Sequence, residues 1–125
     1  MASLRELVRL VHATPGVAGA AVVGRDGLVI DVAGLDTGAA DHVAALAPGL
    51  VAAAEMLADA GTAGELRAVA IEGAAGVLLA MPLSAEVTLV AALDGGADGG
   101  GAGEALFALR RARGVYARDY AAGRT

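Results

Sequence analysis

The segment from Asp36 to Ala60, DTGAADHVAALAPGLVAAAEMLADA, decides how the rest of the chain is arranged. At a helical period its larger apolar residues share one broad face, as a helix packed on a sheet requires: Val43, Leu46, Ala47, Leu50, Val51, Ala54, Leu57 and Ala58. The opposite side is also small or apolar, because it holds Ala45, Pro48, Gly49, Ala52 and Met56. A helix that is apolar nearly all round is normally covered on both sides. We therefore expect a second subunit to cover that opposite side, which is the candidate dimer interface.

Pro48 and Gly49 interrupt this helix. A proline in a helix interior removes a backbone donor and clashes with the preceding turn, at a cost of roughly 3 kcal/mol, and the glycine adds up to about 1 kcal/mol. The pair predicts that the helix kinks at Ala47 or splits in two.

Length and composition limit the possible classes of protein. A chain of 125 residues is long enough for one hydrophobic core, so we expect a single domain over residues 1–125. The absence of cysteine excludes disulfides and thiolate metal sites. No apolar run of about 18 residues escapes a glycine, proline or charge, and residues 1–16 lack a signal-peptide pattern, which predicts a cytoplasmic protein without membrane insertion.

The charge is unevenly distributed along the chain. The net charge of −5 argues against a nucleic-acid partner. Residues 104–125 contain five arginines against Glu104 and Asp119, a net +3, so residues 1–103 carry −8. The basic tail either meets an acidic partner or forms a solvated helix face.

The N-terminal third predicts a helix followed by a hairpin. Residues 1–14 form an amphipathic pattern with Ser3 and Glu6 as a capping box. Two β-rich runs, Val17–Val23 and Leu28–Ala33, flank an Asp26-Gly27 turn, in which the glycine accepts the positive φ of a primed turn. Alternation in the second run places Asp31 toward solvent.

The C-terminal half predicts three strands and a helix. Glu65–Glu72, Val77–Leu83 and Glu86–Leu93 are joined by links too short for crossover helices, so they form an antiparallel meander. Its last strand is apolar on both faces and central, whereas Arg67 suits an edge. After an expected flexible loop, Asp94–Gly103, a helix over Glu104–Ala121 has two sides. Ala105, Leu109, Ala112, Val115 and Tyr116 face the sheet, and Arg110, Arg111 and Arg118 point away. Phe107 either packs under the loop or awaits a partner.

The resulting element order, α-β-β-α-β-β-β-α, predicts an α+β fold. Its five-stranded antiparallel sheet carries two helices on one face and the long helix on the other.

No pattern in the chain indicates catalysis. Without lysine there is no phosphate-binding P-loop, and Asp94 and Asp98 lack the further oxygen ligands of a calcium site. Neither Ser3 nor Ser84 lies in a nucleophile elbow that could use His12 or His42. We expect no catalytic residue, cofactor or metal, and no enzymatic activity.

The hairpin GVAGAAVVGRDGLVIDVAG, the Ala-rich helix and the stretch GELRAVAIEGAAGVLLAMPLSAEVTLVAAL resemble the roadblock/dynein light-chain family, and its bacterial gliding-protein B type in particular. The resemblance spans Leu4 to about Tyr120 and implies the profilin-like sheet described above. It also implies dimers in which the third strands pair and the middle helices lie side by side. The strand then contributes Leu66, Arg67, Ala68, Val69 and Ala70 to the interface.

The resemblance further implies a partner. Bacterial members commonly regulate or scaffold a small Ras-like GTPase, so we expect a homodimer, or a pair with a roadblock paralogue, that binds such a GTPase. Candidate partner-binding residues are Arg25, Glu55 and Asp59. Members of the gliding-protein B type act without an arginine finger, so Arg25 is not assigned that role. The alternatives are a structural adaptor for motor or sensor-kinase complexes and a small-ligand-binding domain that uses the space under the glycine-rich loop.

Overall fold

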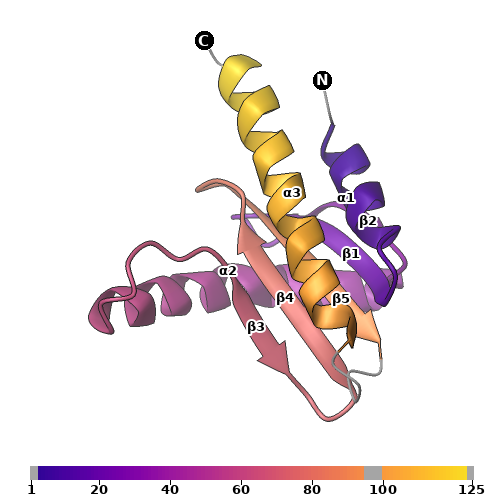
Figure 1. Ribbon diagram of the computed structural model, residues 1–125, viewed down its shortest axis with the longest axis horizontal. Helices are drawn as coiled ribbons and strands as arrows, with labels where there is room; N and C mark the ends of the chain where they lie inside the picture. Colours follow the sequence, from indigo (N-terminus) through magenta and orange to yellow (C-terminus); the bar gives the residue numbers. More distant parts are fainter. Residues whose placement is uncertain (1–2, 95–99, 124–125) are drawn as a thin grey trace.

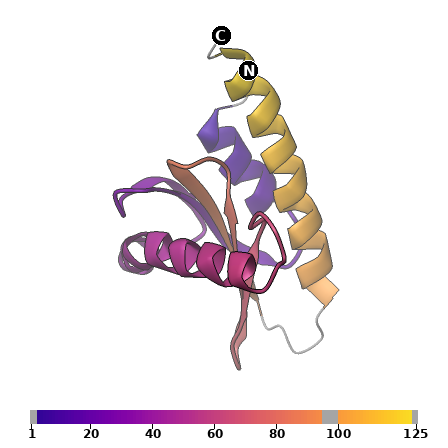
Figure 2. The same cartoon turned by 90° about the vertical axis from the view of Figure 1, so that its left-hand side faces the viewer.

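The computed structural model describes residues 3–94 and 100–123. Figure 1 shows the elements in order: α1 (Leu4–His12), β1 (Val17–Gly24), β2 (Val29–Ala33), α2 (Thr37–Ala60), β3 (Val69–Glu72), β4 (Gly76–Pro82), β5 (Val87–Asp94) and α3 (Gly100–Gly123). The strands form one antiparallel sheet in the order β2-β1-β5-β4-β3. Helices α1 and α3 cover one face and α2 the other (Figure 2). The predicted α+β architecture is confirmed.

The two faces of the sheet carry cores of different size. On the α1 and α3 side the buried residues include large side chains such as Leu7, Met81, Leu89 and Leu109. On the α2 side the buried cluster consists only of alanines and valines: Ala21, Val23, Ala44, Ala47, Ala80 and Val90. Because small side chains let the backbones approach closely, α2 packs on the sheet through its alanines and leaves its larger residues at the flanks.

The β1–β2 turn is tight but not of the predicted primed type. Gly27 has φ +82, whereas Asp26 is not among the residues with positive φ. The Gly24 N–H donates to the Leu28 carbonyl at 2.8 Å, and the Gly27 N–H donates to the Gly24 carbonyl at 3.0 Å. This is a three-residue loop with glycine at its left-handed position. It holds Arg25 at the tip.

The pairing of β2 contains a register shift that the alternation of its residues did not predict. Val22 pairs with Asp31 but Val23 pairs with Val29, so Ile30 is an extra residue. A bulge of this kind moves the following side chains to the other face. Ile30 is therefore exposed, while Asp31 is half-buried and accepts the Val32 N–H at 2.8 Å. Asp31 lies on an edge strand and is partly exposed, and the shift places it on the opposite face of the strand from Val29.

Helix α2 is continuous through Pro48, so the predicted split does not occur. It begins where the Asp36 side chain accepts the Ala39 N–H at 2.7 Å. A proline removes a single helical hydrogen bond, and packing on the sheet supplies most of a helix's stability in a protein. Ala44 and Ala47, next to the proline, are buried against the sheet and hold that part of the helix in place.

We expect Pro48→Ala to stabilise the protein by about 2 kcal/mol. The restored hydrogen bond outweighs the greater freedom of the unfolded chain. Urea denaturation measures the change. Gly49→Ala is the matched control, since a Cβ there meets no atom within 4 Å, and it should add about 1 kcal/mol from helix propensity alone. A loss of stability in the proline variant alone would mean that the ring's packing matters more than the hydrogen bond.

The third strand is shorter than predicted. Residues 65–68 are not in a strand, because the position opposite Arg67 is Pro82, which has no N–H to donate. Beyond Pro82 the Leu83 N–H turns back to the Val87 carbonyl at 2.9 Å. The edge position of β3 and the central position of β5 are both confirmed.

Helix α3 begins at Gly100, so Gly100–Gly103 belong to it and not to the expected loop. Residues 95–99 of that loop lie outside the described residues. Ala105, Leu109, Ala112 and Tyr116 are buried as predicted, and Val115 is half-buried against the same core. The Tyr116 hydroxyl donates to Ser84 Oγ at 3.4 Å.

Candidate interaction site

Helix α2 exposes large apolar side chains. Leu46 is 73% exposed and Leu57 is 75% exposed, so the prediction that they face the sheet was wrong. The buried residues of α2 are Ala40, Ala44 and Ala47, all before Pro48. Beyond Pro48 the helix extends past the β3 edge of the sheet (Figure 1). The C-terminal half of α2 therefore has an apolar surface that its own chain, as described, does not cover.

An apolar groove lies between α2 and the β3 edge. Its volume is about 370 Å³ and its lining is entirely apolar: Val43, Leu46, Ala47, Leu50, Val69, Ile71, Leu78, Ala80 and Val90. Ile71, on the outermost strand, is 43% exposed. A contiguous exposed apolar surface of this kind marks an interaction site more often than a solvated one. We call it the α2–β3 groove.

The backbone of β3 offers hydrogen bonds next to this groove. Gly73 donates to the Gly76 carbonyl at 2.8 Å, and Ala70 and Ile71 pair with Leu79 and Leu78. In an antiparallel ladder the hydrogen-bonded pairs alternate, so Ala70 and Glu72 direct their N–H and C=O groups away from β4. These groups lie at the open edge of the sheet, where a strand of another chain can add.

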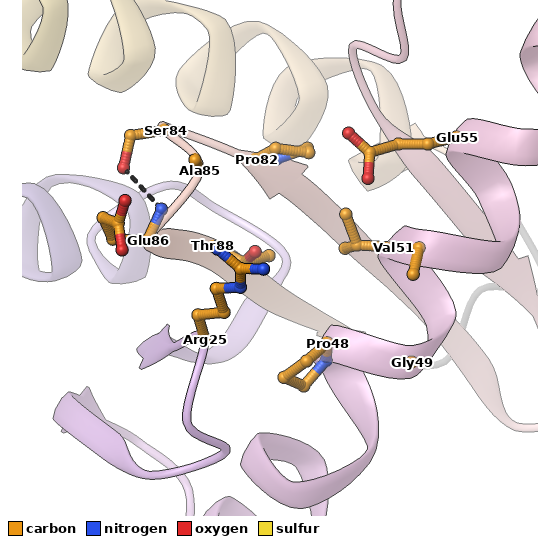
Figure 3. Close-up of a pocket in the computed structure, with 11 residues that line it drawn as sticks. Arg25, Pro48, Gly49, Val51, Glu55, Pro82, Ser84, Ala85, Glu86 and Thr88 are labelled. Atoms are coloured by element: carbon orange, nitrogen blue, oxygen red, sulfur yellow. Dashed lines mark hydrogen bonds between the residues drawn. The ribbon is translucent and has the colours of Figure 1, made fainter.

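A second hollow lies on the other flank of α2 (Figure 3). Its volume is about 520 Å³, and it is formed by α2, the β1–β2 turn and the β4–β5 connection. We call it the Arg25 cleft, and its lining is Arg25, Pro48, Gly49, Val51, Ala52, Glu55, Pro82, Ser84, Ala85, Glu86 and Thr88. In Figure 3 the Arg25 side chain extends toward Thr88 and Glu55 reaches from α2 toward Pro82.

Backbone hydrogen bonds position the polar groups of the cleft. The Arg25 N–H donates to the Glu86 carbonyl at 2.8 Å, and Ser84 Oγ accepts the Glu86 N–H at 3.2 Å. Among the side chains that the structure describes, the one ion pair joins Arg113 to Glu65 at 3.9 Å. The guanidinium of Arg25 and the carboxylates of Glu55 and Glu86 therefore line one cleft without pairing with each other. They remain available to a polar partner.

The sequence-predicted interface residues divide among several surfaces. Pro48, Gly49 and Ala52 line the Arg25 cleft, whereas Val69 lines the α2–β3 groove. Leu66, Arg67, Ala68 and Ala70 line a hollow of about 700 Å³ beside α3, on the opposite face of the sheet. Ala45 and Met56 are exposed on α2. The dimer interface stays a prediction, and the groove adds Leu46, Leu50 and Ile71 to it.

The predicted partner-binding residues are only partly brought together. Arg25 and Glu55 share the cleft, but Asp59 lies exposed one turn beyond Glu55 and does not line it. Sequence reasoning missed the contribution of the β4–β5 connection, because no residue pattern indicated that Ser84 and Glu86 would lie beside the hairpin tip.

Two further properties concern possible ligands. Across the described part of the chain, no three His, Asp or Glu side chains gather as a metal site would require. Helix α2 has 24 residues, and the mean hydropathy of an 18-residue part of it is 1.5, so it has the length and composition of a membrane span. Of that 18-residue part, 17% is buried. Length and composition alone are weak evidence for a span, and a helix covered by a partner subunit has the same properties.

Comparison with known proteins finds domains of the same fold. Residues 4–92 match the family model of the Roadblock/LC7 domain. A Roadblock/LC7 domain from Streptomyces avermitilis is 29% identical, with TM-score 0.78, over 95% of this chain and 98% of that chain. Myxococcus xanthus MglB is 19% identical, with TM-score 0.79, over 97% of this chain and 99% of that chain. A structure of MglB with tetrameric arrangement is 20% identical, with TM-score 0.75, over 90% and 84% respectively. No curated protein sequence matches.

Proposed function

The chain belongs to the Roadblock/LC7 domain family, and from that premise we propose that it is a homodimeric, non-enzymatic regulator or scaffold of a small Ras-like GTPase. The observation that carries the proposal is that the open β3 edge and the apolar α2–β3 groove lie side by side. Together they supply both the backbone hydrogen bonds and the apolar area that a stable protein interface needs.

Self-association is the first part of the proposal. In a dimer built through β3, the half of α2 that extends past this edge lies over the sheet of the second copy. Leu46, Leu57 and Ile71 are then covered, and the N–H and C=O groups of Ala70 and Glu72 find partners. The tetrameric arrangement described for an MglB structure is in keeping with self-association of this fold.

The GTPase is the second part, and the Arg25 cleft is its proposed contact. The residues of α2 that line the cleft lie on the other flank of the helix from those that line the α2–β3 groove. The lining of the cleft combines an arginine, two carboxylates and the apolar surface of Pro48 and Val51. Mixed linings of this kind suit a folded protein partner. The fold similarity to MglB motivates the choice of a Ras-like GTPase.

The dimer is tested by light scattering during size exclusion, over a tenfold range of concentration. The expected mass is about twice the 12.1 kDa of the chain at every concentration. A mass of one chain throughout would rule out the dimer and leave α2 to a different partner.

The GTPase is tested by mixing the purified dimer with each small Ras-like GTPase of its own genome, loaded with GDP or with a non-hydrolysable GTP analogue. Nucleotide-dependent binding supports the proposal, and the rate of GTP hydrolysis in the complex separates regulation from scaffolding. Binding to motor or sensor-kinase proteins, with no GTPase bound in either state, favours the adaptor alternative.

We expect Arg25→Ala to weaken GTPase binding at least tenfold without changing the dimer mass. Arg25 is exposed at the turn tip and supports the fold through its backbone, so the loss is confined to the interface. Isothermal titration measures the affinity. Arg9→Ala, an exposed arginine on α1, is the control that should bind normally. Equal affinities for the two variants would remove the cleft from the proposed contact.

A further inference from the structure

The helices on the two faces of the sheet carry opposite charge. Helix α2 contains Asp41, Glu55 and Asp59 and no arginine or lysine. Helices α1 and α3 together contain six arginines against Glu6, Glu104 and Asp119, a net +3 in a protein whose net charge is −5. An anionic partner is therefore repelled by most of the molecule and attracted to the α1 and α3 layer.

Within this layer, α3 presents the side chains of an interface. Phe107, Arg110, Arg111 and Arg118 are all exposed, and we call them the α3 outer face. Phe107 is 63% exposed, and the guanidinium carbon of Arg111 lies 6.0 Å from the centre of its ring. Aromatic residues and arginine are the types most enriched at the energetic centres of protein interfaces. Helix α3 also lies beyond residues 4–92, so this surface is not part of the match to the family.

A hollow next to Phe107 shows what kind of group the face accepts. Its volume is about 420 Å³, and it lies between the start of α3 and the α1–β1 loop, lined by Thr14, Pro15, Gly103, Phe107, Ala108 and Arg111. Five of these residues provide carbon surface or a hydroxyl, and Arg111 provides a cation. The hollow therefore suits an apolar side chain with a carboxylate close by.

We propose that the α3 outer face binds an acidic segment of a partner protein, with one apolar side chain of that segment seated in the hollow beside Phe107. The concave shape favours a protein over an anionic membrane, since a flat lipid surface cannot fill a hollow. The face lies across the sheet from α2 (Figure 2), so it binds independently of the proposed GTPase contact. The dimer would then join two different partners on its two faces.

The experiment measures binding of a fluorescein-labelled, 12-residue peptide of glutamate and aspartate with one central phenylalanine, by fluorescence anisotropy. The comparison probes are the same peptide with serine in place of phenylalanine, and vesicles containing phosphatidylserine. The variants are Arg111→Glu and Phe107→Ser, both at exposed positions, with Arg5→Glu on α1 as the matched charge reversal. Circular dichroism and the solution mass report whether each variant keeps its fold and assembly.

The expected result is saturable binding of the phenylalanine peptide that weakens as salt is raised. Arg111→Glu and Phe107→Ser should each weaken it at least tenfold, and the serine peptide should bind the unmodified protein at least fivefold more weakly. Arg5→Glu should retain affinity within about twofold, because it lies on α1 and not in the hollow. Equal losses for Arg5→Glu and Arg111→Glu, indifference to the phenylalanine, or binding to the vesicles but not the peptide would each overturn the proposal.

Discussion

Gly34→Ala is expected to cost more than about 4 kcal/mol of folding free energy, a large share of the roughly 5–15 kcal/mol that stabilises a typical domain. Gly34 follows β2 and has φ +80, a conformation that costs an L-residue about 1–2 kcal/mol. A Cβ at this position would also overlap the Ala18 carbonyl oxygen and lie 2.9 Å from the Cα of Gly19. These are backbone atoms of β1, the strand that joins β2 to the centre of the sheet, so they cannot move without disturbing the pairing.

The same Cβ would lie 2.6 Å from His12 Nε2. His12 therefore packs its ring against Gly34, which explains a residue for which the sequence indicated no function. Urea denaturation of the purified variant, extrapolated to water, measures the cost.

Gly64→Ala is the matched control for this experiment. Gly64 has φ +87, but a Cβ there meets no atom within 4 Å. It should therefore cost only the conformational part, about 1–2 kcal/mol. Similar losses for the two variants would show that conformation alone, and not the contact between β1 and the end of β2, makes glycine necessary at position 34.

Ala70→Pro is expected to convert the dimer to a monomer of 12.1 kDa. The Ala70 N–H points away from β4 to the open edge, so a proline here removes a donor that only a second chain could use. The β3–β4 ladder keeps its own hydrogen bonds, and the monomer should stay folded with a loss of about 1 kcal/mol or less. Light scattering gives the mass, and thermal unfolding followed by circular dichroism gives the stability.

Ala70→Ser separates the loss of the N–H from a change of side chain. Serine keeps the backbone donor at nearly the same volume, so this variant should remain a dimer. If Ala70→Pro also remains a dimer, the copies associate through some surface other than the β3 edge. The exposed Leu46 and Leu57 of α2 would then be the residues to substitute next.

The candidate surfaces show how far sequence patterns reach. The hairpin turn placed Arg25 at an exposed tip, and that position follows from the Asp26-Gly27 pair and its two flanking strands alone. That Glu55, Ser84 and Glu86 would line a cleft with Arg25 follows from no local pattern, because these residues come from α2 and from the β4–β5 connection. Only the packing of α2 across the sheet brings the three segments together.

The sequence by itself determined the order of the elements, the antiparallel meander, the central β5 and the position of β3 at an edge, since each depends on short links and on local apolar patterns. The tertiary structure decided which side of α2 meets the sheet. Helical periodicity predicts which side of a helix faces the sheet only when the other side is distinctly polar, and α2 is apolar nearly all round. Close packing therefore made the choice, burying Ala40, Ala44 and Ala47 and leaving Leu46 and Leu57 exposed. The tertiary structure also decided the length of β3, because it places Pro82 of β4 opposite Arg67, and a proline cannot donate the next hydrogen bond of the ladder.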